Sequence, residues 1–302
     1  MIDIACFGHI TVDLYFKSDS FTHNQNRLKL AIGGKYFADK FIQKIGGGGY
    51  NCAVGCSRNG LKPALIATIG NNEFRSFLLK TIKKNKILTN YLQTAKDYIA
   101  VSAIILTETG DKTVISYQKH KTRLISKNKL EKLAKLCQYF YFGNMQEFSL
   151  SKRIKILRFL KKQNKFIFAN FGVEDCRKST SMLEKAISNV DVLIQNEYEI
   201  ADILKKPHKE LNFELNLAQT EPLLKGKTIV VTFGKKGSIC YTAKASFYQP
   251  AKRVKKVADT TGAGDAYTAG FISTFIKTGD IKLSMKNATK YSASILKEIG
   301  AN

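Results

Sequence analysis

The sequence lacks the patterns that identify several common classes of protein. It has no uninterrupted apolar run long enough to cross a bilayer, so we expect no membrane partner. It contains neither a Gly-x-x-x-x-Gly-Lys-Ser/Thr phosphate loop nor a Gly-x-Ser-x-Gly nucleophile elbow, which argues against P-loop NTPases and α/β-hydrolases. With only 4 Pro there is no Pro-rich linker, and we predict one domain over residues 1–302.

Acidic residues are scarce: 24 Asp and Glu stand against 49 Lys and Arg, for a formal net charge of +25. An excess of this size can indicate nucleic-acid binding. The lysines are spread along the whole chain without a long basic block, so we interpret them as solvated and predict no specific nucleic-acid partner. The positive charge would still attract anionic substrates such as nucleotides.

The chain has 6 Cys but no Cys-x-x-Cys pair. Cys52 and Cys56 lie four residues apart on a predicted helix, and no nearby histidine completes a metal set. We therefore interpret the cysteines as reduced, buried thiols, which favours a reducing, cytoplasmic location.

Short apolar strands alternate with helices along most of the sequence. Strands are predicted at 1–7, 64–69, 139–142, 166–170, 190–194 and 228–232, and helices at 50–59, 73–86, 150–162, 181–188, 197–204, 268–276 and 285–297. This alternation predicts an α/β fold with a doubly wound, mostly parallel sheet covered by helices on both faces.

Two segments, about 14–45 and 98–117, interrupt the alternation and are richer in turn and polar residues. The first holds a predicted strand at 36–45. The second is typical of a β-hairpin with its turn at 108–111. We predict that these strands form a small sheet that stands off the core as a lid.

A turn of small residues, Gly262-Ala263-Gly264, runs into a predicted helix and is flanked by Asp259 and Asp265. A helix start without bulky side chains leaves backbone N–H groups bare and adds the positive end of the helix dipole, so the turn is suited to a phosphate. A carboxylate at that point makes sense as a base for a hydroxyl that attacks phosphorus, the role we assign to Asp265. An ordinary N-cap in a glycine-rich loop is the alternative.

Four consecutive glycines, 46–49, precede Asn51 at the start of another helix. They would let a backbone approach a ligand closely, and the Asn51 amide could bond ligand hydroxyls. Asp13 follows the first strand, at the sheet edge where α/β proteins bind ligands, and could accept two bonds from a sugar. A turn-capping role for Asp13 is the alternative.

Two further strand ends carry candidate nucleotide contacts. Asn196 and Glu199 fit a helix capping box and would also orient a magnesium–water–phosphate cluster. Thr232, Gly234 and Gly237 lie in a turn that could wrap a nucleotide, although a plain β-turn explains the pattern equally well.

In this order, the motifs resemble those of the ribokinase-like PfkB family of carbohydrate kinases, over nearly the whole chain. The glycine segment with Asn51 is similar to the N-terminal family signature, and segment 259–269 to the more specific C-terminal one. The resemblance implies a ribokinase-like fold with a small β lid, and transfer of phosphate from ATP with Mg²⁺ to a primary hydroxyl of a sugar. A monovalent cation such as K⁺ and a homodimer formed through the lid are further expectations.

The resemblance also implies a role for each matching residue. For catalysis these are Asp265 as the base and the backbone N–H groups of Gly262, Ala263 and Gly264 as the anion hole. For the sugar they are Asp13, Gly47, Gly48 and Asn51, with Asp259 near the substrate or a monovalent-cation loop. For ATP they are Asn196, Thr232, Gly234, Gly237 and Asn287, with Glu199 as an indirect Mg²⁺ contact.

Two positions depart from ribokinases proper, which tend to carry Asn where this chain has Thr11 and Lys where it has Gly48. The resemblance therefore does not imply D-ribose as the substrate. An adenosine-type nucleoside kinase is one alternative. A non-catalytic sugar- or nucleic-acid-binding protein is another, against which the intact Asp265 and its glycine turn argue.

Overall fold

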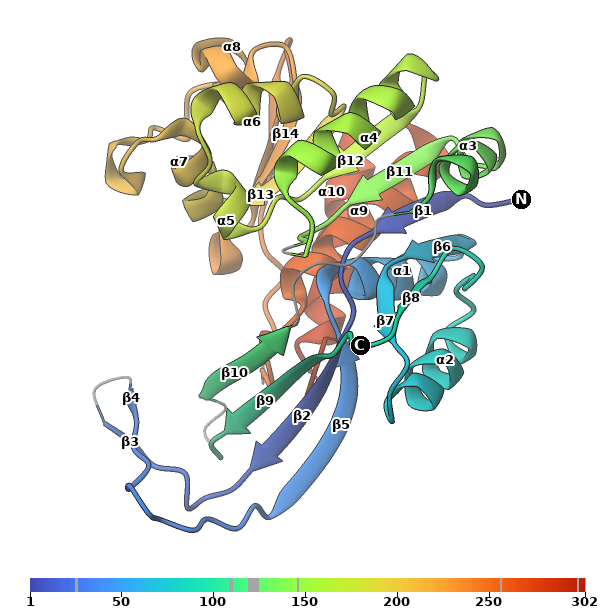
Figure 1. Ribbon diagram of the computed structural model, residues 1–302. Coiled ribbons are helices and arrows are strands. Elements are labelled where there is room, and N and C mark those ends of the chain that lie inside the picture. The colour runs from blue at the N-terminus through green and yellow to red at the C-terminus, as the bar shows by residue number, and fades with distance from the viewer. Residues whose placement is uncertain are drawn as a thin grey trace.

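The largest sheet of the computed structural model has eight strands in the order β16-β15-β14-β13-β12-β11-β1-β6 (Figure 1). Strands β14 to β6 of this order pair in parallel, and β15 and β16 add an antiparallel edge. The strands are β1 (Ile4–Phe7), β6 (Pro63–Ile66), β11 (Tyr139–Phe142), β12 (Phe166–Ala169), β13 (Val192–Asn196), β14 (Thr228–Thr232), β15 (Ser238–Tyr241) and β16 (Ser246–Gln249). The predicted α/β class is confirmed. The structure describes residues 1–24, 27–108, 111–118, 125–145, 147–255, 257–297 and 299–301.

Helices cover both faces of this sheet, and each set builds its own apolar cluster. One face carries α3 (Lys127–Leu136), α4 (Leu150–Lys162), α5 (Val173–Cys176), α6 (Thr180–Ile187), α7 (Glu197–Leu204) and α8 (Leu217–Thr220). The other carries α1 (Gly48–Arg58), α2 (Arg75–Lys84), α9 (Ala263–Thr278) and α10 (Ile281–Ile295). No helix in the described ranges is long and apolar enough to cross a membrane.

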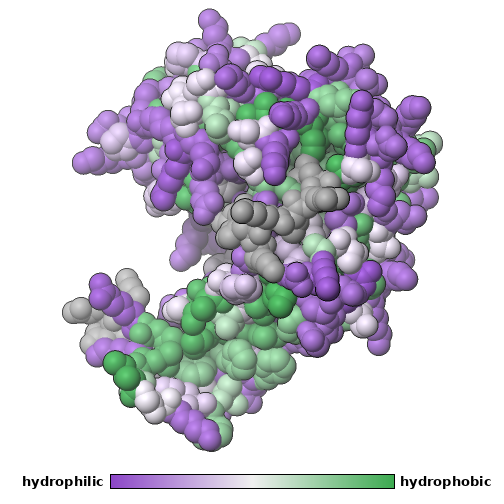
Figure 2. Space-filling view, viewed as in Figure 1, coloured by the Kyte–Doolittle hydropathy of each residue, from purple (hydrophilic) through white to green (hydrophobic). Residues whose placement is uncertain are grey.

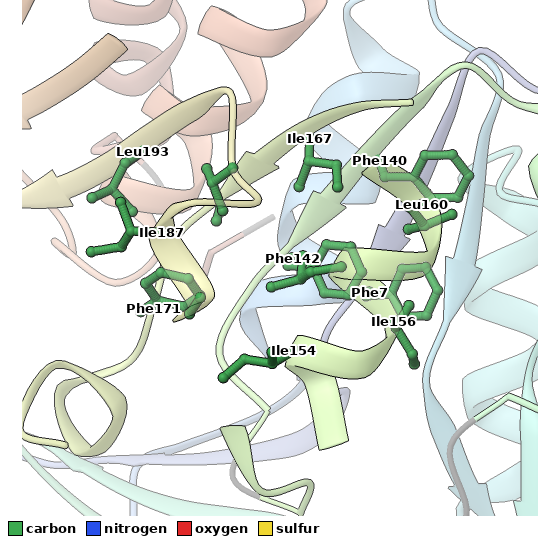
Figure 3. Close-up of a cluster of buried hydrophobic side chains, with 14 of the residues drawn as sticks. Phe7, Phe140, Phe142, Ile154, Ile156, Leu160, Ile167, Phe171, Ile187 and Leu193 are labelled. Carbon is green, nitrogen blue, oxygen red and sulfur yellow. The ribbon is translucent and has the colours of Figure 1, made fainter. Parts of the chain in front are cut away.

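Central strands supply side chains to both clusters because successive residues of a strand point to opposite faces. Phe7 of β1 joins the α4 side, where it stacks on Phe142 with ring centroids 4.6 Å apart (Figure 3). Cys6, its neighbour, joins the α1 side instead. Strands buried on both faces explain the continuous apolar runs in the sequence.

All six cysteines are buried and free, as predicted. Cys6, Cys52 and Cys56 lie together, with their sulfur atoms within 4.8 Å of one another. Burial raises the pKa of Cys6 and Cys52 well above the usual value, so these two groups are neutral thiols that pack as small apolar side chains.

A second sheet has the order β10-β9-β2-β5 and stands off one end of the molecule (Figure 1). Its strands are β2 (Thr11–Lys17), β5 (Lys40–Gly46), β9 (Ala100–Leu106) and β10 (Lys112–Gln118). β2 and β9 run parallel, and the outer pairs are antiparallel. β2 follows β1 after three residues, so the small sheet grows directly from the carboxyl edge of the large one.

Two short pairs complete the strands: β3 (His23–Asn24) with β4 (Arg27–Leu28), and β7 (Thr68–Gly70) with β8 (Gln93–Ala95). The predicted strand at 36–45 begins only at Lys40. The predicted hairpin pairs as expected, although residues 109–110 of its turn lie outside the described residues.

Several predicted boundaries are wrong, and two of the errors affect the site. Helix α9 begins at Ala263 rather than residue 268. Its first turn consists of small residues without apolar periodicity, so the sequence pattern missed it; packing against a neighbouring helix stabilises this turn. β13 begins at Val192 rather than residue 190 and runs on to Asn196, which is both the last strand residue and the cap of α7.

Candidate active site

Two motifs that are far apart in the sequence meet at one hydrogen bond. Nδ2 of Asn51, in the first turns of α1, donates to Oδ2 of Asp265, in the first turn of α9, at 2.7 Å. α1 packs directly on α9, which fixes the two helix starts relative to each other. The predicted sugar-side and phosphate-side residues therefore share one point.

The start of α9 has the geometry of an anion site. Its N-cap, Gly262, has a φ of 74°, and a Cβ there would overlap Ala301, so glycine is required. A Cβ on Gly264 would meet no atom within 4 Å, which leaves the backbone open at that residue. Of the three predicted N–H donors, that of Ala263 already donates a hydrogen bond to the carbonyl oxygen of Thr260, with an N–O distance of 3.3 Å.

The carboxyl group of Asp265 has a raised pKa. Burial raises its pKa above the usual aspartate value, while the Asn51 bond and the nearby His9 lower it. His9 lies at the end of β1, where its Nδ1 donates to the carbonyl of Asn144 at 3.0 Å. The net effect of burial and these two contacts is a carboxyl group whose pKa lies above that of an ordinary aspartate.

Three of the four glycines at 46–49 are required by close packing. A Cβ on Gly46 would overlap the Asp13 carboxylate, and one on Gly49 would overlap Gly8. Gly47 has a φ of 98°, and a Cβ there would press on the His9 carbonyl. Only Gly48 has space, because its Cβ would stand 3.4 Å from Oδ1 of Asp265. Gly48 is thus the glycine that leaves room beside the base.

Asp13 lies inside strand β2, so the turn-capping alternative is wrong. The residue is 8% exposed, and Oδ1 accepts a bond of 2.9 Å from the Thr11 hydroxyl. Burial raises its pKa, and the charge of Asp259 adds to the rise, whereas Thr11 and His9 lower it. A buried acceptor of this kind is placed to receive hydroxyl protons.

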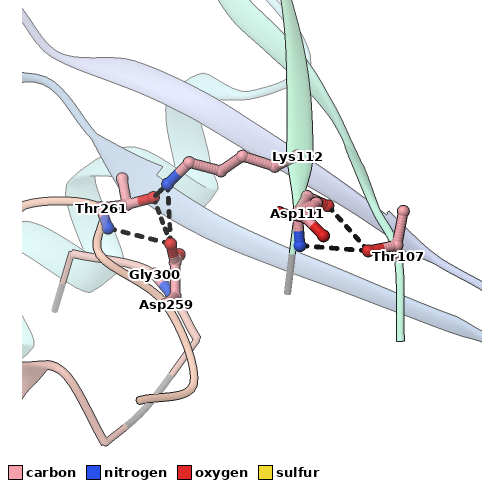
Figure 4. Close-up of polar contacts among 6 residues, drawn as sticks. All are labelled: Thr107, Asp111, Lys112, Asp259, Thr261 and Gly300. Atoms are coloured by element: carbon pink, nitrogen blue, oxygen red, sulfur yellow. Dashed lines mark hydrogen bonds and ion pairs between the residues drawn. The ribbon is translucent and has the colours of Figure 1, made fainter. Parts of the chain in front are cut away.

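Asp259 forms the most densely bonded group near the site (Figure 4). Oδ1 accepts from Lys112 Nζ at 2.7 Å and from the Thr261 backbone and hydroxyl at 2.9 and 2.7 Å. Oδ2 accepts from the Gly300 N–H at 3.1 Å. Burial alone would raise the pKa of Asp259, but Lys112, Thr261 and Gly300 together lower it.

Asn196 and Glu199 form the predicted capping box at the start of α7. The Asn196 side chain accepts from the N–H groups of Tyr198 and Glu199, and Oε2 of Glu199 accepts from the Asn196 N–H at 3.0 Å. Burial raises the pKa of Glu199, and the charge of Asp265 raises it further. The two carboxylates are therefore within electrostatic reach, and oxygen donors of this charge fit a hydrated Mg²⁺.

The other predicted nucleotide residues lie farther along the same edge. Thr232 ends β14 directly beside Asn196. Gly234 and Gly237 bound a short 3₁₀ turn with φ values of 54° and 109°. Asn287 is not gathered with Asp265, because its side chain bonds Thr274 at 3.3 Å, about two and a half turns along α9.

The structure adds a residue that the sequence did not identify. Glu147 follows the end of β11 and is 6% exposed; its Oε2 accepts from Gln118 of β10 at 3.0 Å. Its Oε1 has no hydrogen-bond partner among the described residues. The signal was available, since Glu147 follows a buried strand at the ligand-binding edge, as Asp13 does. Lys112 had no such signal, because only the folded small sheet brings it to Asp259.

Comparisons with known proteins show the family to which the chain belongs. A family model described as pfkB family carbohydrate kinase matches residues 1–302. A nucleoside kinase of Methanocaldococcus jannaschii is 26% identical over 286 residues, covering 93% of this chain and 86% of the relative. A deoxyribokinase of Salmonella typhi is 25% identical over 299 residues, covering 97% and 92%.

The fold also matches solved structures. An Arabidopsis thaliana ribokinase, solved as a complex with ribose and ATP, superposes with a TM-score of 0.82 at 18% identity, covering 100% of this chain and 95% of that one. The predicted ribokinase-like fold, a large mostly parallel sheet with a small second sheet, is thus confirmed.

The pKa of Asp265 yields a prediction that needs no substrate. We expect its carboxyl to titrate above the usual aspartate range, and higher still in Asn51→Leu, because the lost bond favoured the charged form. Carboxyl ¹³C NMR during a pH titration measures both values. Asn59→Leu, which removes an amide from the other end of α1, serves as the control. A pKa that does not rise in Asn51→Leu would contradict this account.

Proposed function

Because the chain belongs to the PfkB family of carbohydrate kinases, we propose that it transfers the γ-phosphoryl group of ATP to a primary hydroxyl of a sugar. ATP-dependent kinase activity is the shared property of the family, and the sugar hydroxyl is the specific part of the proposal. The Asn51–Asp265 bond carries it, since it joins the sugar-side helix to the phosphate-side helix at a carboxylate suited to act as a base. Phosphoryl transfer depends on such alignment more than on covalent chemistry.

Asp265 would accept the proton of the attacking hydroxyl. Its Oδ2 is occupied by Asn51, while the space beside Oδ1 is kept free by Gly48. The raised pKa of this carboxyl group increases its affinity for the proton of the hydroxyl. The Oδ1 atom is therefore the site to which we assign proton transfer.

The backbone at Gly262, Ala263 and Gly264 would stabilise the transferred group. Developing negative charge at the start of α9 meets N–H donors and the positive end of a 16-residue helix. The donors are part of the backbone, and the Ala263 N–H would exchange its bond to the Thr260 carbonyl for one to the phosphoryl group.

Buried oxygen acceptors support a ligand rich in hydroxyls. Asp13 and Glu147 are nearly inaccessible carboxylates. Oε1 of Glu147 has no partner among the described residues, and an acceptor left unpaired in a closed site costs about 1–3 kcal/mol. Sugar hydroxyls would donate to both carboxylates, with Asn51 and the backbone of Gly47 and Gly48 completing the contacts. The similarity to a nucleoside kinase favours a second candidate, in which the sugar is the ribose of a nucleoside.

ATP would lie along the edge formed by the ends of β13 and β14. Asn196, Thr232, Gly234 and Gly237 are the contacts we assign to it, with Asn287 on the adenine side. Mg²⁺, when bound with ATP, neutralises phosphate charge. Glu199, whose pKa is raised by the nearby charge of Asp265, is the residue that would hold the water shell of Mg²⁺.

The outer face of the small sheet favours a homodimer. Register places Phe16 beside Phe41 and Ile105, and Leu14 in line with Ile115. Phe41 and Ile115 are 60% and 61% exposed, and Figure 2 shows a broad apolar area over this sheet. We expect sedimentation equilibrium to give twice the 33.8 kDa chain mass. A monomer at micromolar concentration would contradict this assembly.

The buried, free thiols favour a cytoplasmic location.

A coupled assay of ADP release tests the function. The acceptors are pentoses, 2-deoxypentoses, hexoses, their phosphates and nucleosides. Phosphorylation of a free sugar in preference to nucleosides supports the proposal, and a strict preference for nucleosides selects the second candidate. Stimulation of ATP turnover by none of these acceptors would overturn it.

With the best acceptor from that assay, Asp265→Asn should lose about 10²–10⁴-fold in turnover, because the amide cannot accept the proton. The control is Asp280→Asn at the cap of α10, where asparagine caps a helix as well as aspartate. Far-UV circular dichroism should be unchanged in both variants. An Asp265→Asn enzyme with near wild-type turnover would remove the base from the mechanism.

A graded series at Gly264 tests the anion site. The structure has room for a side chain there, so Gly264→Ala and Gly264→Val should both fold. We expect turnover to fall moderately with alanine and steeply with valine, because the larger group keeps the phosphate away from the N–H donors. Equal turnover across the series would show that the phosphate does not approach this backbone.

A further inference from the structure

The loop that precedes α9 receives a positive charge from the small sheet. Lys112, the first residue of β10, donates from Nζ to Oδ1 of Asp259 at 2.7 Å and also contacts the Thr261 hydroxyl (Figure 4). The Asp259 side chain is 1% exposed and that of Lys112 is 25% exposed. A nearly inaccessible carboxylate is thus balanced by an ammonium from a different sheet.

The other positions around the Asp259 carboxylate are filled by donors as well. Thr261 donates twice to Oδ1, and the Gly300 N–H donates to Oδ2. A monovalent metal ion binds through oxygen ligands. At Asp259 such an ion would have to displace the ammonium and lie against N–H groups. The residues present do not fit the K⁺ that the family resemblance led us to expect at this loop.

We propose that the Lys112 ammonium takes the place of a monovalent metal cation at Asp259, so that the kinase works without K⁺. The ammonium neutralises Asp259 and fixes segment 259–261, which leads directly into the anion-binding start of α9. Lys112 is therefore a positioning residue that acts through Asp259 and Thr261 and does not touch the reacting atoms. The proposal rests on the proposed kinase function for its activity readout, but not for its stability readout.

Lys112 also gives the small sheet a mechanical connection to the catalytic helix. Asp259 and Lys112 are 147 residues apart, and their ion pair joins β10 to the segment before α9. A displacement of the small sheet would withdraw the cation from Asp259. Lys112 therefore neutralises Asp259, beside the anion site, only when the small sheet is in place.

The first experiment compares wild-type protein in potassium chloride and in choline chloride at matched ionic strength. We expect the same melting temperature and the same turnover in both salts, because the cation is already supplied. Stimulation of turnover by K⁺ of severalfold, or a higher melting temperature specific to K⁺, overturns the proposal. Both wild-type results hold their meaning even if every Lys112 variant fails to fold.

The second experiment uses Lys112→Ala. In choline chloride its turnover should fall about 10²-fold, the loss expected when a catalytic segment is misplaced by about 1 Å. K⁺ or methylammonium should restore part of the turnover and raise the melting temperature, since either cation replaces the positive charge lost beside Asp259. Wild-type turnover in Lys112→Ala without added cation, or a folded variant that neither cation rescues, overturns the proposal.

Lys17→Ala is the matched control. Lys17 also pairs with a carboxylate of the small sheet region, with Nζ 2.7 Å from Oε2 of Glu108, but its partner is Glu108 and not Asp259. The control should retain wild-type turnover and show no rescue by either cation. If no acceptor is phosphorylated by the wild type, the kinase function fails, while the melting temperatures still decide the role of Lys112.

Discussion

The contact between the Asn51 amide and the Asp265 carboxylate is the constraint on which the site depends. It requires α1 and α9 to begin at the same place, although 214 residues separate the two partners. The glycines around it serve that requirement. Gly49 lets the start of α1 cross Gly8 closely, and Gly262 turns the chain into α9 beside Ala301. Small residues here are needed first to bring backbones together. Room for a substrate remains only where Gly48 and Gly264 leave it.

The small sheet contributes chemistry as well as cover. Because β2 starts three residues after β1, the edge that binds ligands in a doubly wound sheet continues into the small sheet without a linker. Asp13 and Lys112 both belong to this sheet, and Lys112 bonds Asp259 in the segment before α9. The small sheet supplies the cation for Asp259, so the charge balance of this carboxylate depends on the position of the sheet. If Asp13 binds substrate as proposed, the same position also governs an acceptor of the site and the exclusion of water.

Periodicity predicted the large sheet and most helices because their burial is strong and regular; β11, α4, α7 and β14 have the predicted bounds. It failed where packing replaces propensity, as at the start of α9. Asp265 and Asn51, whose side chains the fold brings together, were singled out by sequence motifs. Lys112 was not, since an isolated lysine in a chain of 49 basic residues carries no local sign that it will reach a buried carboxylate. Contacts between sheets are a product of the tertiary fold.

Acidic residues are a minority in this chain, yet several lie together at the candidate site, and their hydrogen-bond partners differ. Asp259 receives an ammonium and three hydrogen bonds from Thr261 and Gly300, so its pKa falls and it stays charged as a structural anion. Asp13 and Asp265 receive fewer donors, so burial dominates and their pKa values rise. Environment thus separates carboxylates of identical chemistry into one whose pKa is lowered and two whose pKa values are raised, a division that suits the different roles proposed for them. The cation at Asp259 is what permits this division, because an unbalanced charge there would raise the pKa of Asp13 further.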